Sequence, residues 1–253
     1  MNLLCGAVIA FSMYSKIPVP HIEWTKERMR YMFCFFPLIG GVIAALMLLW
    51  MRFGKEIAGD GTLFTAVFVL IPVLVTGGIH LDGYLDTSDA LSSYKTMEEK
   101  LEILKDSHAG AFAVISGICY FVLYFGACGE MTWERIYILA PCFVLSRALS
   151  ALAVVTFKKA KNSGLAASFS DMAQQRTVGV CMAVYILVCG IALIVIGKAA
   201  GLLVFAASLL TFVWYRKMAY RKFGGITGDL AGFFLQVCEL VMILTSYIAL
   251  RFV

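Results

Sequence analysis

Long apolar runs separated by short polar segments dominate the chain. A helix that crosses a bilayer needs about 20 mostly apolar residues, and runs of about that length recur from residue 32 onward. The opening run, residues 1–14, is short for a span and could cross at a tilt, lie in the interface or re-enter. The pattern predicts an all-α, polytopic integral membrane bundle of about seven or eight transmembrane or re-entrant helices. The predicted membrane segments are residues 32–51, 62–81, 109–128, 136–156, 178–197, 199–214 and 230–250.

A short amphipathic helix is predicted between the second and third of these segments. Thr96 and Glu99 fit a capping box, in which the two residues satisfy each other's backbone N–H groups. Met97, Leu101 and Leu104 then fall on one apolar face. The glutamates of the opposite face are explained by a helix that lies on the membrane surface or on the protein.

Composition excludes a soluble domain. The 253 residues are 61% hydrophobic and 15% charged, whereas soluble domains are about 45–50% apolar and about 25% charged. The eight cysteines form no C-x-x-C pair, so the chain shows no zinc site and no disulfide framework. Residues 1–253 are therefore expected to form a single membrane domain in a lipid bilayer, and a homo-oligomer is compatible with this composition.

The distribution of Lys and Arg predicts the orientation of the bundle. Fifteen of them lie in alternate loops, five lie in the intervening loops, and Arg147 lies within a predicted membrane segment. Cytoplasmic loops carry the excess of basic residues, so the first set faces the cytoplasm. The net charge of +5 thus reports topology and does not indicate nucleic-acid binding. The basic loops are residues 15–31, 82–108, 157–177 and 215–229.

An acidic string follows the second apolar segment. Seven of the 16 acidic residues lie between residues 82 and 106, and Asp82, Asp86 and Asp89 are spaced i, i+4 and i+7. At 3.6 residues per turn these three carboxylates share one helical face, where they repel one another. Such a group suits a hard cation such as Mg²⁺ or Mn²⁺. The alternative is a solvated helix start, where acids complement the helix dipole.

Three further polar residues border this string. Asp106 lies where the chain re-enters the membrane, and a carboxylate there could complete a metal site. His80 and His108 flank the string on its two sides. Each could donate a hydrogen bond to a substrate phosphate or be an ordinary interfacial histidine. Loops 78–110 and 216–230 are accordingly the predicted catalytic segments.

A glycine-rich turn precedes the last membrane segment. Gly224, Gly225 and Gly228 allow backbone N–H groups to approach an anion closely, although the spacing is not that of a Walker A loop. Asp229 and the intramembrane Arg147 are functional candidates, and an ion pair with a buried carboxylate is the alternative for Arg147. Carboxylates, glycine turns and basic residues on one face indicate phosphoryl or nucleotidyl transfer.

Five strings occur in an order that resembles the cobalamin synthase family, the adenosylcobinamide-GDP ribazoletransferases. The most specific is the acidic string, and the resemblance covers about residues 11–240. The strings are Lys16–Pro20, Phe36–Gly40, His80–Asp89, Lys105–Phe112 and Gly224–Asp229.

The resemblance implies the last joining step of the nucleotide loop in cobalamin biosynthesis. The 3′-hydroxyl of α-ribazole, or of its 5′-phosphate, would attack the cobinamide-bound phosphate of adenosylcobinamide-GDP and release GMP. Mg²⁺ would be held by Asp82, Asp86, Asp89 and Asp106, with Asp89 accepting the hydroxyl proton. The site would face the cytoplasm from the cytoplasmic membrane of a prokaryote. Substrate contacts are expected from His80, Gly83, Lys105, Ser107, His108, Arg147, Gly224, Gly225, Thr227, Gly228 and Asp229.

Two other functions compete with this interpretation. A CDP-alcohol phosphotransferase-like lipid synthase also uses membrane-edge aspartates with Mg²⁺, but its usual D-G-x-x-A-R run is not matched, because Leu85 and Asp86 follow Tyr84. A cation-coupled transporter would place such carboxylates near the bilayer midplane, whereas these lie at the ends of apolar segments.

Overall fold

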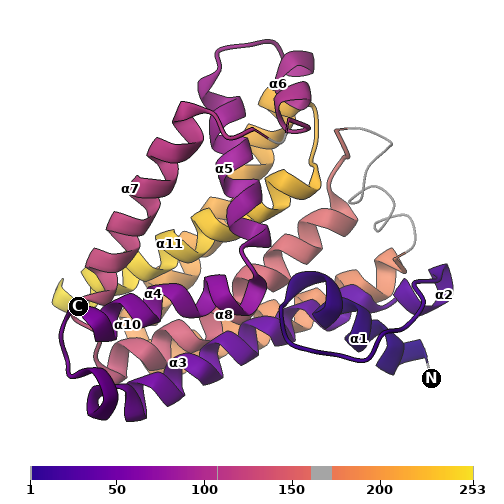
Figure 1. Cartoon of the computed structure of the whole chain (residues 1–253). Coiled ribbons are helices and arrows are strands. Elements are labelled where there is room, and N and C mark those ends of the chain that lie inside the picture. The colour runs from indigo at the N-terminus through magenta and orange to yellow at the C-terminus, as the bar shows by residue number, and fades with distance from the viewer. Residues whose placement is uncertain (1, 107, 161–172, 253) are drawn as a thin grey trace.

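The computed structural model describes residues 2–106, 108–160 and 173–252, and these residues form helices without a β-strand (Figure 1). Five helices are long and apolar enough to cross a membrane, and the bent pair α4–α5 would make a sixth. The predicted all-α membrane bundle is therefore confirmed. The elements are α1 (Asn2–Tyr14), α2 (Lys26–Met29), η1 (Met32–Cys34), α3 (Phe36–Ala58), α4 (Thr62–Thr76), α5 (Ile79–Ser92), α6 (Met97–Ile103), α7 (Ala111–Cys128), α8 (Trp133–Thr156), α10 (Gln175–Phe223) and α11 (Gly228–Phe252).

The centre of the bundle is α8, which packs against α3, α10 and α11. Its side chains Leu139, Phe143 and Leu145 are buried. Helix α3 approaches α8 closely at Gly40, where an added Cβ would collide with the backbone of Phe143. Small residues at such crossings let membrane helices pack backbone to backbone, because lipid offers no hydrophobic drive for their association.

Helix α10 is a hairpin of two antiparallel halves. Lys198 interrupts the helical backbone with φ 48° and ψ −124°. Beyond it the chain returns alongside itself, since a Cβ added at Gly190 would lie 2.8 Å from the Phe205 ring. The two segments predicted at 178–197 and 199–214 are thus confirmed, with the break between them.

The predicted segment 62–81 is wrong in one respect. It divides at Gly77–Gly78 into α4 and α5, whose axes differ by 96°. Both glycines have positive φ, +66° and +79°, which other residues adopt only with strain. The acidic string therefore lies on a helix of its own, turned away from the apolar α4.

Helix α6 has the predicted capping box, with Thr96 and Glu99 satisfying each other. Its residue Leu101 is buried and Met97 packs against Gly224, so the apolar face rests on the protein. Figure 1 shows α6 beyond the end of α5, which itself lies beside α7 and α11. We term one end of the bundle its basic end. It comprises the ends of α5, α8 and α10 and the starts of α7 and α11.

Candidate active site

Four carboxylates gather at the basic end, and we term them the acidic group. Asp82, Asp86 and Asp89 lie on the uninterrupted helix α5, and Asp229 lies in the first turn of α11. Asp82 is exposed and the other three are half-buried, so the acidic group is open to solvent on one side. In the described part of the chain, no basic side chain forms an ion pair with any of them.

Asp86 lies on α5, after the apolar segment that ends with α4, and its pKa reflects burial and the repulsion between these carboxylates. Partial burial raises the pKa of Asp86 to about 6, and the charges of Asp82, Asp229 and Asp89 contribute further. A bound cation would relieve this repulsion, because an opposite charge within a few ångströms favours the ionised carboxylate. The donor set is all oxygen, which fits a hard cation.

Two glycines bring α11 onto α5. A Cβ added at Gly83 would lie 2.7 Å from the backbone oxygen of Asp229, and one added at Gly232 would lie 3.1 Å from the backbone oxygen of His80. The two helices thus cross in direct backbone contact, and this crossing places Asp229 beside the α5 aspartates. Gly83 therefore supports the site through packing.

Asp89 lies at the start of α7. Its carboxylate occupies the space where a side chain at Gly110 would stand, and Gly110 is the N-cap residue of α7. The N-terminus of a helix carries partial positive charge from its unpaired N–H groups, which stabilises a neighbouring carboxylate.

The glycine-rich turn supports the site through its backbone bonds. The N–H groups of Gly224 and Gly225 donate to Tyr220 and Ala219 at the end of α10, at 3.2 and 3.3 Å. The N–H of Ile226 donates to the oxygen of Lys158 at 2.9 Å. These donors are occupied within the protein, so an anion would meet the following residues instead.

The residues that open toward the acidic group are Thr227 and Gly228. The Thr227 hydroxyl accepts a hydrogen bond from the Leu230 N–H at 3.2 Å and lies 3.4 Å from Asp229 Oδ2, to which it donates. Gly228 is exposed at the start of α11. A phosphate approaching here would meet a helix N-terminus, which favours anions.

Asp106 and His108 pair with each other in the connection between α6 and α7. His108 Nδ1 lies 2.7 Å from Asp106 Oδ1, and both side chains are exposed. Hydrogen bonds from the ring and the backbone N–H of His108 lower the pKa of Asp106. Lys105 pairs with Glu102 at 3.0 Å, and Ser107 lies outside the described residues.

His80 and Arg147 are both buried. The His80 ring stacks on Tyr14 at 5.9 Å. Arg147 donates to Glu239 at 2.7 Å and to the oxygen of Phe143 at 2.8 Å, and both members of the ion pair are 1% exposed. The buried carboxylate that could pair with Arg147 is thus Glu239, and this ion pair joins α8 to α11.

Gly232, Gly110 and Lys16 contribute to the site but were not among the predicted residues. Gly228 and Gly232 have the small-xxx-small spacing that marks close helix contacts in membranes, so the sequence carried a signal for Gly232. Lys16 lies across Gly77, and its N–H donates to the Val75 oxygen at 2.8 Å. The first loop thereby fixes the break before α5.

No three His, Cys, Asp or Glu side chains in the described ranges converge into a complete metal-binding cluster. A cation at the acidic group would therefore need water or substrate oxygens to complete its coordination. This is the usual mode for Mg²⁺, which retains several waters and binds through one or two carboxylates and substrate phosphates.

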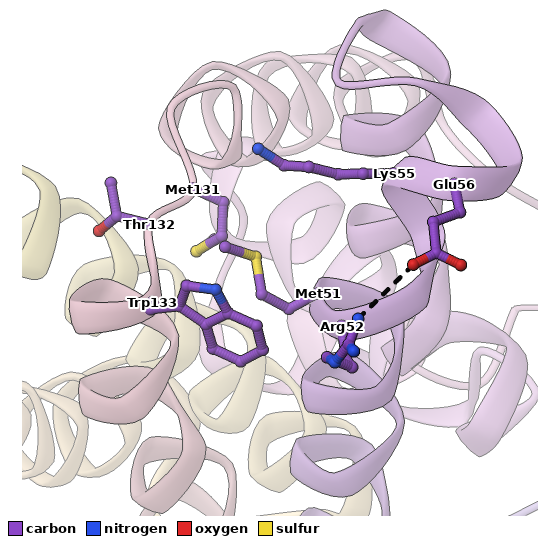
Figure 2. A pocket seen from close by; sticks show the side chains of 7 residues that line it. All are labelled: Met51, Arg52, Lys55, Glu56, Met131, Thr132 and Trp133. Atoms are coloured by element: carbon purple, nitrogen blue, oxygen red, sulfur yellow. Dashed lines mark ion pairs between the residues drawn. The ribbon is translucent and has the colours of Figure 1, made fainter.

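A cavity of about 560 Å³ lies at the opposite end of the bundle, between the end of α3 and the start of α8 (Figure 2). It contains no member of the acidic group. In Figure 2 Arg52 turns to Glu56, with which it forms an ion pair at 3.6 Å, while Met51, Met131 and Trp133 form the apolar wall. This cavity is not continuous with the candidate site.

Known proteins resemble this chain over nearly its whole length. The profile described as Cobalamin-5-phosphate synthase matches residues 6–247. A protein of Lachnoclostridium phytofermentans named adenosylcobinamide-GDP ribazoletransferase is 48% identical over 98% of this chain and 95% of its own length. Proteins of the same name from Clostridium botulinum (strain Alaska E43) and Treponema denticola are each 34% identical, over 95% and 96% of this chain and 96% and 97% of their own lengths. The comparison with solved structures found no match.

Proposed function

Because this chain belongs to the Cobalamin-5-phosphate synthase family, we propose that it carries out the reaction named for its relatives, with Mg²⁺ at the acidic group. The substrates would be adenosylcobinamide-GDP and α-ribazole or its 5′-phosphate. The products would be GMP and adenosylcobalamin or its 5′-phosphate. The observation that carries the proposal is the set of four carboxylates gathered where α5, α7 and α11 meet, with no basic partner among the described residues.

The proposed reaction forms one phosphodiester bond and breaks one phosphoanhydride bond. The 3′-hydroxyl oxygen of α-ribazole bonds to the phosphorus attached to cobinamide. The bond from that phosphorus to the bridging oxygen breaks, and GMP leaves with this oxygen. Asp89, whose carboxylate lies at the start of α7, would accept the hydroxyl proton.

Asp82 and Asp86 would be the principal metal ligands, with Asp229 beside them. When bound, Mg²⁺ would neutralise the charge of the phosphate oxygens and orient the leaving group. Thr227 and Gly228 at the start of α11 would meet the phosphate or ribose groups. The orientation predicted from Lys and Arg would open this site to the cytoplasm, where a soluble nucleotide substrate and GMP can enter and leave.

The proposal is tested with the full chain reconstituted in liposomes. Adenosylcobinamide-GDP, α-ribazole and Mg²⁺ are supplied, and GMP and adenosylcobalamin are measured by liquid chromatography and mass spectrometry. We expect both products in equal amounts, their loss with a chelator and their return with Mg²⁺. Absence of GMP from folded protein would contradict the reaction, and turnover unaffected by chelation would contradict the metal.

Matched substitutions test the residues. Asp82→Ala and Asp86→Ala should each abolish turnover while the protein still reaches the membrane. Glu98→Gln changes an exposed carboxylate of α6 and should leave turnover unchanged. Near-normal activity of either aspartate variant at limiting Mg²⁺ would refute the ligand assignment.

A further inference from the structure

The second half of α10 presents a continuous apolar face that ends in two cations. Leu202, Leu210 and Val213 are 51%, 70% and 51% exposed, as expected for side chains in contact with lipid. Arg216 and Lys217 are exposed one turn further on. From the break after Lys198 to Arg216 the helix rises about 26 Å at about 1.5 Å per residue, close to the hydrocarbon thickness of about 30 Å. The two cations therefore lie at headgroup level.

A cavity of about 400 Å³ lies where this face changes from apolar to basic. Phe212, Val213, Arg216 and Lys217 of α10 form one wall, and Thr156 and Phe157 at the end of α8 form the other. The cavity thus combines a basic rim at the headgroup level with an apolar base that continues into the lipid-facing stripe.

Arg216 is held in place by aromatic rings. Its guanidinium carbon lies 5.6 Å from the centroid of the Phe157 ring and 5.2 Å from that of the Tyr220 ring. The Tyr220 hydroxyl is itself fixed, because it accepts the Lys158 N–H at 2.7 Å. An arginine oriented in this way loses little conformational freedom when it binds an anion.

Arg216 and Lys217 also have no ion-pair partner in the described part of the chain. No carboxylate in ranges 2–106, 108–160 and 173–252 forms an ion pair with either. Arg52, at the other cavity, lies over the Phe53 ring in the same manner, at 5.1 Å, but is paired with Glu56. Of these two arginines that contact aromatic rings, Arg216 is therefore the one whose guanidinium is not already paired with a described carboxylate.

We propose that the cavity between Phe157 and Arg216 binds the phosphate headgroup of an anionic phospholipid from the leaflet at the basic end of the bundle. The guanidinium of Arg216 would donate two parallel hydrogen bonds to phosphate oxygens, and Lys217 would add a point charge. The acyl chains would lie along the Leu210–Val213 face. Basic pockets between membrane helices on the cytoplasmic side bind anionic headgroups by this chemistry. The site is separate from the acidic group and does not depend on the proposed reaction.

The test uses the full chain in phosphatidylcholine nanodiscs that contain a small fraction of phosphatidylglycerol. Native mass spectrometry counts the phosphatidylglycerol molecules that remain bound per protein as their fraction is varied. We expect one retained molecule for the unmodified chain. Arg216→Gln should weaken its binding about tenfold, as expected for loss of a hydrogen bond between charged groups. Inorganic phosphate in millimolar excess should not displace it.

Two variants separate a specific site from general attraction. Arg52→Gln removes the paired arginine of the other cavity and should leave lipid retention unchanged. Arg216→Lys keeps the charge but removes the planar fork, and should bind at an intermediate level; it also provides a test if Arg216→Gln does not fold. The proposal is overturned if Arg216→Gln retains the lipid fully, if Arg52→Gln loses as much, or if inorganic phosphate displaces the lipid.

Discussion

The contact between Gly83 and Asp229 offers a sharp test of how the acidic group is assembled. Gly83→Ala adds a Cβ that would lie 2.7 Å from the Asp229 oxygen and 3.0 Å from its Cα. An ordinary contact is at least 3.4 Å, so α11 must move by about 0.7 Å. A misplacement of about 1 Å at a reacting centre reduces the rate by about a hundredfold. We therefore expect turnover to fall by between about tenfold and a hundredfold.

The stability of this variant should change much less. Overpacking lowers the free energy of unfolding by about 1–3 kcal/mol, and replacing glycine by alanine within a helix raises it by about 0.5–1 kcal/mol. The net loss of roughly 1–2 kcal/mol would lower the melting temperature by only a few degrees, which is measurable in detergent by scanning fluorimetry. Activity and the Mg²⁺ concentration for half-maximal rate would be measured on the same preparation.

Gly126→Ala is the matched control for Gly83→Ala. Gly126 lies within α7, and an added Cβ there would meet nothing within 4 Å. This variant should keep full activity and have unchanged or slightly higher stability. The reasoning is refuted if Gly83→Ala retains normal turnover and Mg²⁺ dependence, or if Gly126→Ala loses as much activity.

The charges of Asp86, of the Arg147–Glu239 pair and of Asp106 each have a measurable consequence. Because the pKa of Asp86 is raised to about 6, its carboxylate is protonated below that pH. The Mg²⁺ affinity measured by calorimetry should therefore fall between pH 7 and pH 5. Asp86→Asn should make the affinity depend less on pH. Arg147→Met or Glu239→Leu alone should lower the free energy of unfolding by about 3–5 kcal/mol, because each leaves one buried charge unpaired. The double variant should have a melting temperature closer to that of the unmodified chain. Equal losses of stability in all three variants would contradict a buried ion pair. Asp106→Asn should reduce turnover far less than Asp82→Ala because Asp106 pairs with His108. An equal loss of turnover would indicate that Asp106 is a metal ligand.

The membrane fold could be predicted from local patterns in the sequence. Apolar runs of the correct length identify helices that cross a bilayer, because lipid cannot satisfy exposed backbone groups and each span must bond internally. The same reasoning identified both halves of α10 on either side of Lys198. It did not identify the break at Gly77–Gly78, where an apolar run continues through a sharp turn. Hydropathy records side-chain polarity and carries no information on backbone direction.

The acidic string was also a local signal. Its i, i+4, i+7 spacing places Asp82, Asp86 and Asp89 on one face of any helix, whatever surrounds it. The roles of glycines were harder to assign, since the same residue type serves anion binding, tight turns and close packing. Gly224 and Gly225 direct their N–H groups to α10, and Gly83 packs against the backbone of Asp229.

The sequence by itself determined that the chain lies in a membrane, where its basic loops fall, and that three aspartates share one face. These properties depend on residues close together along the chain. Only the tertiary structure decided that Asp229 joins those aspartates, that Glu239 pairs with Arg147, and that the Phe157 and Tyr220 rings hold Arg216. Each of these depends on which helix faces meet, and that is set by backbone contacts at positions such as Gly83 and Gly232, far apart in sequence.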